Sequence, residues 1–374
     1  MRVALIARST LYTVPDGDTT QVTETCRFLN KLGMIAEVRL SSGQINYELY
    51  DLLHFFNLIR PADIFYQSRK ANKPYVISTI LVDYNEYDKH HRGGLASIFN
   101  YLSADGIEYM KTMAQCTLGC DCLASRNYIW KGQKRGIMEI LRKAAMIPPN
   151  SESEYRRVEQ YYPTKVKYKI IPNRIGPGKF APQHAKKRDD TMLCVASVED
   201  IKNQANLIEG LNNSKFNVTL VGSGSPGQSD YYKYCTGIAA GSIQFIDYLP
   251  QHELVKYYRQ AKGHILPSWF EATGLVSLEA AVIGCNIVIS NRSDAREYFG
   301  NHAFYYDPAD PESLLQALQQ ASETPCDKEL RNLILEKYTW QQAALQTLKH
   351  INQYYETAHS HIRNTGNTQQ LRRF

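Results

Sequence analysis

The chain has 374 residues, of which 43% are hydrophobic and 21% are charged. This composition excludes collagen, coiled coil and wholesale disorder, and the length suggests two domains. The 43 lysines and arginines exceed the 37 acids, so the net charge is +6. Such a mild excess suits an anionic ligand or an acidic membrane surface, and it argues against nucleic acid as a partner.

The N-terminus and the cysteines both indicate an intracellular protein. The first residues, MRVALIARST, lack the long apolar core and the cleavage site of a signal peptide. No apolar run reaches the length of a transmembrane helix, so we expect a cytoplasmic protein. Cys116, Cys120 and Cys122 cluster, but their spacing is unlike that of a zinc site. We expect no metal there, and mostly buried, reduced thiols elsewhere.

The first half of the chain alternates between strand-like and helix-like segments. The periodicity of Thr19–Leu32 predicts a helix that ends at Gly33. Strands are predicted at Val3–Ala7, Met34–Leu40, Asp51–Phe56 and Tyr75–Thr79. This alternation of strand and helix predicts a parallel, doubly wound sheet.

A stretch rich in proline and glycine divides the chain. It runs from Pro172 to Pro182 and precedes the charged run Lys186–Asp190, a composition typical of a linker. We therefore predict an N-terminal domain over residues 1–178 and a C-terminal domain over residues 179–338.

The second half repeats the alternation more regularly. Strands are predicted at Met192–Ala196, Asn217–Val221, Ile243–Ile246, Gly263–Leu266, Asn286–Ser290 and Ala303–Tyr306. Helices are predicted at Asn203–Leu211, Gln251–Arg259, Leu275–Ile283 and Trp340–Tyr355. The last helix, within residues 339–358, is predicted to pack back on the N-terminal domain, and the tail 359–374 to be flexible. Two such domains leave a cleft, where ligands bind beyond the carboxyl ends of the strands.

The most informative motif lies where a strand leads into a helix. Glu271 and Glu279 are eight residues apart, which is about 12 Å along a helix. Paired glycosidase carboxyls lie roughly 5 to 9.5 Å apart, so this spacing is too long for that chemistry. It suits an elongated ligand, with a phosphate at the helix N-terminus near Gly274 and a ribose diol on Glu279. The alternative is a solvated helix with two ordinary glutamates.

The stretch PSWFEATGLVSLEAAVIGCNIVIS, Pro267–Ser290, closely resembles the donor-site motif of retaining glycosyltransferases of family 4, the group 1 glycosyltransferases. Four more segments resemble the same family: Pro149–Glu154, Ile171–Ile175, Thr219–Gly224 and Phe245–Leu249. The resemblance is close over the C-terminal half and looser over the N-terminal half. It implies a GT-B fold, that is, two Rossmann-like domains facing a cleft.

The resemblance also implies how such a protein works. The C-terminal domain would bind a nucleoside-diphosphate sugar, and the acceptor would enter from the N-terminal domain, with no metal or other cofactor. An acceptor hydroxyl would attack from the face of the leaving group, assisted by a phosphate oxygen. The implied acceptor is a glycan or lipid-linked sugar in surface polysaccharide or glycolipid assembly. A peripheral contact with the inner face of the membrane stays open.

Individual residues take roles from the same resemblance. Glu271 would contact the transferred sugar, Glu279 would bind the ribose, and Lys202 would neutralise the leaving diphosphate. Taken alone, Lys202 is equally a solvated lysine at a helix start. Other donor-binding residues would be Thr273, Gly274 and Leu275 through their amides, and Gly222, Gly224, Ser197, Tyr248 and Gly17 in loops after strands.

The sequence departs from the family pattern on the donor side. Ser197 stands where the family usually has an arginine beside the diphosphate, so one cation is missing. Arg174, Arg292 or Arg296 could replace it, or the activity is weak.

On the acceptor side, Ile80 or Leu81 stands where the family often has a histidine. Asp83 is the nearest polar candidate for an acceptor-side base. Gly17 lies in a loop with one glycine instead of two, where helix capping explains the neighbouring residues as well as ligand binding does. His54, at the end of a strand, is better explained as a core histidine.

Competing interpretations remain at the level of sequence. Gly222, Gly224 and Gly227 match the dinucleotide fingerprint, and Asp247 follows 20 residues later, which would indicate an NAD-dependent oxidoreductase. That hypothesis leaves Glu271 and Glu279 without a role. A non-catalytic nucleotide-sugar-binding protein and a nucleotide-sugar epimerase are the further alternatives.

Overall fold

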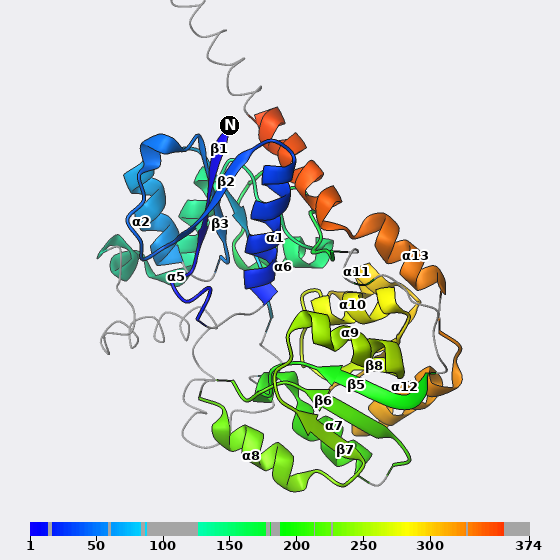
Figure 1. The fold of residues 1–374 in the computed structure, drawn as a ribbon. Helices are drawn as coiled ribbons and strands as arrows, with labels where there is room; N and C mark the ends of the chain where they lie inside the picture. Colours follow the sequence, from blue (N-terminus) through cyan, green and yellow to red (C-terminus); the bar gives the residue numbers. More distant parts are fainter. Residues whose placement is uncertain are drawn as a thin grey trace, which may run out of the picture.

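The computed structural model describes residues 1–13, 17–58, 61–83, 87, 126–176, 180, 188–212, 214–225, 227–326 and 328–354. The expectations for Cys116, Cys120 and Cys122 and for the tail 359–374 lie outside these residues. Figure 1 shows two α/β domains, the N-terminal one above and the C-terminal one below, each built around one sheet.

The N-terminal domain contains a four-stranded parallel sheet in the order β2-β1-β3-β4. Its strands are β1 (Arg2–Ala7), β2 (Ile35–Leu40), β3 (Leu52–Phe56) and β4 (Tyr75–Ser78). Its helices are α1 (Gly17–Lys31), α2 (Pro61–Ala71), α5 (Arg126–Lys143) and α6 (Glu152–Tyr161), with a 3-10 turn at Tyr47–Leu49. All of β3 and all of β1 after its first residue are buried, as expected when helices cover both faces of a parallel sheet.

The C-terminal domain contains a six-stranded parallel sheet in the order β10-β9-β8-β5-β6-β7. Its strands are β5 (Asp189–Val195), β6 (Asn217–Val221), β7 (Ile243–Ile246), β8 (Ala261–Leu266), β9 (Asn286–Ser290) and β10 (Ala303–Tyr306). The chain order reverses between β5 and β8, so this sheet has its switch point there. In open α/β sheets, ligands bind beyond the carboxyl ends of the strands at that point.

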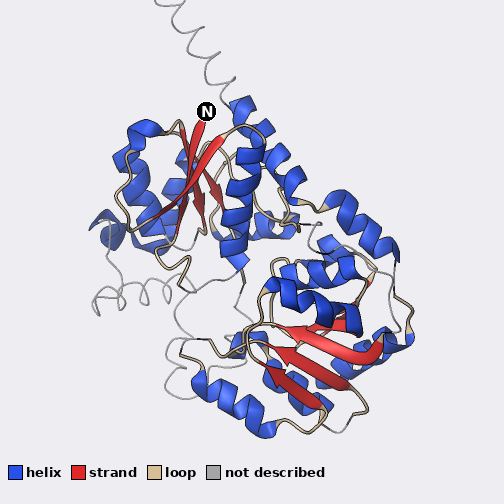
Figure 2. Ribbon diagram, viewed as in Figure 1, coloured by secondary structure: helices blue, strands red, loops and turns tan. Residues whose placement is uncertain are grey.

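Helices cover both faces of this second sheet, as Figure 2 shows. One core cluster joins the strands to α9, α10 and α13, and another joins them to α7, α8 and α12. The helices are α7 (Gln204–Leu211), α8 (Ser229–Ile238), α9 (Gln251–Gln260), α10 (Leu275–Ile283), α11 (Ala295–Phe299), α12 (Pro311–Glu323) and α13 (Lys328–Lys337). The predicted pair of doubly wound α/β domains is confirmed.

A C-terminal helix over residues 340–354 returns to the N-terminal domain. Ala344 and Ile351 are buried in the cluster that contains β1 and α1 residues, and Trp340 packs beside Ile171. The chain therefore crosses between the domains twice, once through the linker and once before this helix.

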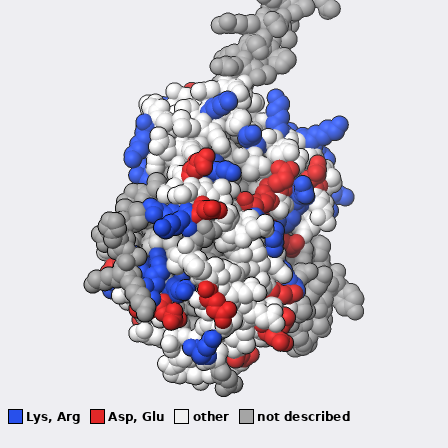
Figure 3. Space-filling view, turned by 90° about the vertical axis from the view of Figure 1, so that its right-hand side faces the viewer, with Lys and Arg blue, Asp and Glu red and all other residues white. Residues whose placement is uncertain are grey.

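The surface carries both signs of charge. On the face shown in Figure 3, basic and acidic side chains intermix, so the excess of +6 is not gathered into one basic stripe there. Within the described ranges, none of the helices combines the length and the apolar character needed to cross a bilayer.

Candidate functional site

Lys202 and Glu271 meet at the switch point of the C-terminal sheet. Lys202 ends a 3-10 turn (Asp200–Lys202) that follows β5, and Glu271 lies beyond the end of β8. The Lys202 Nζ is 2.7 Å from Glu271 Oε1, and the Ser268 hydroxyl donates to the same oxygen at 2.7 Å. The two charged side chains are 23% and 13% exposed. The result is an oriented ion pair that solvent, and therefore a ligand, can still reach.

A backbone hydrogen bond fixes the two segments that carry this pair. The Trp269 N–H donates to the Ile201 carbonyl at 3.1 Å. Since β5 and β8 are paired strands, the chain leaves both at the same edge of the sheet. Residues 69 positions apart in sequence therefore become neighbours because of the strand order.

The N-terminus of α10 lies three residues after Glu271. Gly274 there adopts φ 66° and ψ 64°, and no side chain caps the helix. A Cβ on Gly274 would lie 3.2 Å from Leu266 and 3.3 Å from the Ser277 hydroxyl oxygen, so glycine suits both the conformation and the space. The first N–H groups of a helix lack intrahelical partners and form the positive end of its dipole. Leu275, the first residue of α10, thus begins a helix end whose local charge is favourable for an anion.

Thr273 is nearly buried beside this helix start. Its hydroxyl accepts a hydrogen bond from the Asn173 side chain at 3.2 Å and donates to the Tyr298 hydroxyl at 3.3 Å. Because the Thr273 side chain is hydrogen-bonded within the protein, its backbone is the part better suited to contact a ligand.

Glu279 lies in the second turn of α10 and is 9% exposed. The Gln251 side-chain amide donates to one carboxylate oxygen, and the Tyr258 hydroxyl lies 3.5 Å from the other. Burial, followed by the Glu279 charge, raises the pKa of Tyr258 well above its ordinary value, so Tyr258 remains a neutral donor. Two neutral hydrogen-bond donors thus contact Glu279, whereas a lysine pairs with Glu271.

Gly222 and Gly224 follow β6. A Cβ on Gly222 would lie 1.8 Å from the Ala196 carbonyl oxygen, so the two chain segments touch backbone to backbone. A Cβ on Gly224 would lie 3.2 Å from the Tyr232 Cβ. Both glycines therefore have a packing role in the structure, whether or not they also approach a ligand.

Ser197 and Tyr248 are both exposed but have different hydrogen-bond partners. The Ser197 hydroxyl donates to the Glu199 carboxylate at 2.9 Å. Tyr248 is 71% exposed, and its backbone N–H donates to the Ser223 hydroxyl at 3.1 Å. The Tyr248 ring is therefore open for stacking against a planar ligand.

The three arginines that could replace the missing cation have different surroundings. Arg174 is buried at the linker, where it donates to the Lys337 carbonyl and to the side chain of Gln346 at 3.0 Å. Burial lowers its pKa to about 10. Arg296 lies over the Tyr305 ring, with Cζ 4.1 Å from the ring centre.

Of the three, Arg292 contacts the segment that carries Glu271. It pairs with Asp307 at 2.8 Å, and its Cζ lies 5.7 Å from the centre of the Trp269 ring.

One further cation, Arg8 of the N-terminal domain, was missed by the sequence analysis. Arg8 follows β1 and binds both carboxylate oxygens of Asp18, at 2.7 and 2.9 Å. The sequence feature that could have identified Arg8 is a charged residue directly after a buried strand.

Asp83, Gly17 and His54 belong to the N-terminal domain. Asp83 accepts a hydrogen bond from the Tyr161 hydroxyl at 2.8 Å. Gly17 begins α1 with open space around its Cβ position. His54 is buried, contacts the Ser78 hydroxyl at 2.9 Å and stacks on Phe56. Burial lowers its pKa to about 3, as expected for a core histidine.

The start of α6 is tied to the end of β4 through Glu154. The Ser151 hydroxyl caps α6 by accepting from the Glu154 N–H at 2.9 Å. The buried Glu154 carboxylate accepts from the Thr79 hydroxyl, from the Leu81 N–H at 3.0 Å and from the Asn150 N–H at 2.8 Å. Burial raises the pKa of Glu154 although these bonds oppose the shift. This carboxylate is structural.

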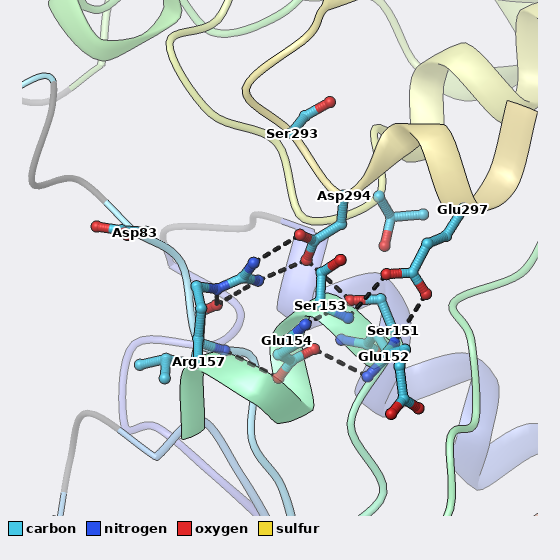
Figure 4. A network of polar contacts seen from close by, with 12 residues as sticks. Asp83, Ser151, Glu152, Ser153, Glu154, Arg157, Ser293, Asp294 and Glu297 are labelled. Atoms are coloured by element: carbon cyan, nitrogen blue, oxygen red, sulfur yellow. Dashed lines mark hydrogen bonds and ion pairs between the residues drawn. The ribbon is translucent and has the colours of Figure 1, made fainter. Parts of the chain in front are cut away.

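The two domains meet where α6 faces α11, as Figure 4 shows. Arg157 of α6 binds both carboxylate oxygens of Asp294, at 2.6 and 2.5 Å, and Ser151 donates to Asp294 at 2.9 Å. Burial lowers the pKa of Arg157, but the hydrogen bonds and charge of Asp294 outweigh it and the pKa is raised. Glu297 of α11 accepts from the N–H groups of Glu152 and Ser153 at 2.8 and 2.7 Å. No local pattern in the sequence indicated these contacts.

Comparisons with known proteins agree with this architecture. Residues 178–340 match the family model of glycosyl transferases group 1. Over 167 residues the chain is 26% identical to O-antigen chain mannosyltransferase B of Escherichia coli. That match covers 42% of this chain and 44% of the relative, so it spans less than half of either protein.

Solved structures match over nearly the whole chain. Sucrose-phosphate synthase of Thermosynechococcus elongatus has a TM-score of 0.73 at 15% identity, covering 96% of this chain and 100% of that one. Anabaena HepE in complex with UDP has a TM-score of 0.66 at 14% identity, covering 94% and 100%. These likenesses confirm the GT-B fold, and the family match supports the resemblance to group 1 glycosyltransferases. In the described part of the chain, no three metal-binding side chains converge as they would around an ion.

Proposed function

We propose that this protein is a retaining glycosyltransferase of family 4 that moves a sugar from a nucleoside-diphosphate sugar to a hydroxyl of a glycan or lipid-linked acceptor. The observation that carries the proposal is the Lys202–Glu271 ion pair beside the N-terminus of α10. It places a cation, a carboxylate and a helix N-terminus at the switch point of a domain that matches group 1 glycosyltransferases.

Each part of this arrangement suits one part of such a donor. The amides at the start of α10 and the Lys202 ammonium carry positive charge where a diphosphate would lie. Glu271 can accept hydrogen bonds from hydroxyls of the sugar while it stays paired with Lys202. Glu279, in the second turn of the helix, would exchange the Gln251 amide for ribose hydroxyls.

The reaction needs charge stabilisation more than it needs a protein nucleophile. As the bond between sugar and diphosphate breaks, negative charge grows on the leaving phosphate. Lys202 is held in place by Glu271 before the reaction and so stabilises that charge with little reorganisation. The acceptor hydroxyl would arrive from the Asp83 side on the face that the diphosphate leaves, which retains the configuration of the sugar.

The relatives support a glycan product. The Escherichia coli relative is by name an O-antigen chain mannosyltransferase, and HepE was solved with UDP. We therefore propose a role in surface polysaccharide or glycolipid assembly on the cytoplasmic side of the membrane, without a metal ion and with peripheral contact to the lipid surface.

Thermal stabilisation by UDP, GDP, ADP, their sugars and NAD(H) tests the proposal. A ligand at a hundred times its dissociation constant adds about 2.7 kcal/mol of stability, enough for a clear shift in melting temperature. A shift with one nucleoside diphosphate and its sugar, lost in Glu279→Ala, is the expected result. A shift with NAD(H) alone would overturn the proposal in favour of an oxidoreductase.

A further inference from the structure

Arg157 of the N-terminal domain reaches the segment of the C-terminal domain that carries Glu271. Its guanidinium binds both carboxylate oxygens of Asp294, and its Cζ lies 4.8 Å from the centre of the Phe270 ring. Phe270 directly precedes Glu271. The Arg157 and Asp294 side chains are only 12% and 2% exposed, so this pair is a largely buried, bidentate contact with one favoured geometry.

Asp294 extends the connection to Glu271 itself. Its backbone N–H donates to the Glu271 carbonyl at 3.0 Å while its carboxylate holds Arg157. Arg157 also donates to the Leu81 carbonyl at 3.1 and 3.3 Å. Leu81 lies two residues before Asp83 in the chain. One arginine therefore contacts both the backbone before Asp83 and the ring before Glu271.

We propose that Arg157 and Asp294 are positioning residues that hold the Glu271 segment in register with the segment Leu81–Asp83. This inference rests on the proposed function, because register matters only if the sugar held at Glu271 must face an acceptor on the Asp83 side. Misplacement of reacting groups by about 1 Å can slow a reaction on the order of a hundredfold. The relative position of these two segments therefore matters for turnover.

A second contact between the domains provides a matched control. The Glu297 carboxylate accepts hydrogen bonds from the N–H groups of Glu152 and Ser153 at the start of α6. These bonds join the same two elements, α6 and α11, as the Arg157–Asp294 pair does. They involve neither Phe270 nor the Glu271 carbonyl. Removing the charge of Glu297 therefore weakens the interface without acting directly on the Glu271 segment.

The experiment compares Arg157→Lys and Asp294→Asn with Glu297→Gln in the full-length protein. Release of UDP from UDP-glucose and of GDP from GDP-mannose reports turnover, and amide hydrogen exchange over residues 268–274 and 291–297 reports the position of the segment. For the first two variants we expect kcat to fall about tenfold or more, KM for the nucleotide sugar to change less than about threefold, and exchange to accelerate in both segments. Glu297→Gln should accelerate exchange at residues 152–153 and keep kcat within about twofold.

Two results would overturn the inference. One is a kcat within twofold of the wild type in both Arg157→Lys and Asp294→Asn, and the other is an equal loss of kcat in Glu297→Gln. If the unaltered protein releases no nucleoside diphosphate from either sugar nucleotide, the proposed function fails for these donors. Hydrogen exchange then decides the inference alone, since unchanged exchange over 268–274 in Arg157→Lys would show that the pair does not position Glu271.

Discussion

The two domains share an architecture but present different chemistry at corresponding places. Each has a parallel sheet whose strand order reverses, between β1 and β3 in one and between β5 and β8 in the other. At the second switch point, Lys202 and Glu271 form a partly exposed ion pair. Near the first, Arg8 forms an ion pair with Asp18 in the first turn of α1, and His54 is buried and neutral. The fold therefore sets where a site lies, while the loops after the strands decide what it can do.

Replacing a glycine by alanine should give the largest difference in stability between the two domains. Gly222→Ala would place a Cβ 1.8 Å from the Ala196 carbonyl oxygen, whereas Gly17→Ala meets nothing within 4 Å. We expect Gly222→Ala to cost about 3 kcal/mol of unfolding free energy because the backbone of two segments must part. Gly17→Ala should change it by less than about 1 kcal/mol. Urea titration measures both, and equal effects would contradict the close packing at Gly222.

Removal of the Lys202 charge should have the next largest effect. Lys202→Ala is expected to lower turnover of the nucleotide sugar by about tens-fold or more, because the leaving diphosphate loses its oriented cation. Lys233→Ala, on a side chain that is 77% exposed in α8, is the control within the same domain. Steady-state release of nucleoside diphosphate measures the change, and a small change for Lys202→Ala would refute its role.

Among the described residues, His54 of the N-terminal domain and His264 of the C-terminal domain are both buried, which predicts similar sensitivity to acid. Burial lowers the pKa of both His54 and His264 to about 3, from an ordinary 6.5. Their stabilising contribution is complete above pH 6.5 and is lost as the pH falls toward 3, since the unfolded chain then binds protons that the folded chain excludes. At pH 5 each histidine should lower the free energy of unfolding by about 2 kcal/mol relative to neutral pH.

Urea unfolding at pH 7 and pH 5 tests this symmetry. His54→Gln and His264→Gln should each reduce the difference in stability between the two pH values. If only one of them does so, the two domains differ in their cores as well as in their sites.

Glu279 tests the donor side more finely. Glu279→Gln is expected to weaken binding of the matching nucleoside diphosphate by about tenfold, since a charged acceptor for ribose hydroxyls becomes a neutral one. Glu253→Gln in α9, with a side chain that is 44% exposed, serves as the control. Calorimetric titration gives the affinities, and unchanged affinity together with unchanged turnover would remove Glu279 from the ribose site.

Substitution of Asp83 should have the smallest effect, and this effect should be confined to the transfer of sugar to the acceptor. Asp83→Asn is expected to slow transfer to a hydroxyl acceptor by about a few-fold, with unchanged binding of nucleoside diphosphate. This is far below the roughly hundredfold or more of full general-base catalysis, because in the proposed reaction a phosphate oxygen of the donor also assists the acceptor hydroxyl. Tyr161→Phe keeps the carboxylate but removes its hydrogen bond. Product formation with an octyl glycoside as acceptor measures both variants, and weaker nucleotide binding in Asp83→Asn would place Asp83 on the donor side instead.

Much of the C-terminal domain followed from local sequence pattern. The predicted strands at Asn217–Val221, Ile243–Ile246 and Asn286–Ser290 match β6, β7 and β9 to the residue. Predicted Gly263–Leu266 begins two residues later than β8. The helices that received no such prediction include α2, α5, α8, α11, α12 and α13. The register and order of strands were also beyond the sequence. The family resemblance implied that Lys202 and Glu271 both act on the donor, but the ion pair between them was not predicted.

The alternation of strand and helix, the division into two domains and the motif around Glu271 could be predicted from the sequence, because they depend on periodicity and on neighbours within a few residues. The contact of Arg157 with Asp294, 137 residues away, and that of Glu297 with the start of α6 are known only from the three-dimensional structure. Likewise, only the structure shows that the Arg174 side chain donates to Gln346 and not toward the proposed ligand site. Such contacts join segments that are distant in the chain, and their geometry is set by the packing of both domains together.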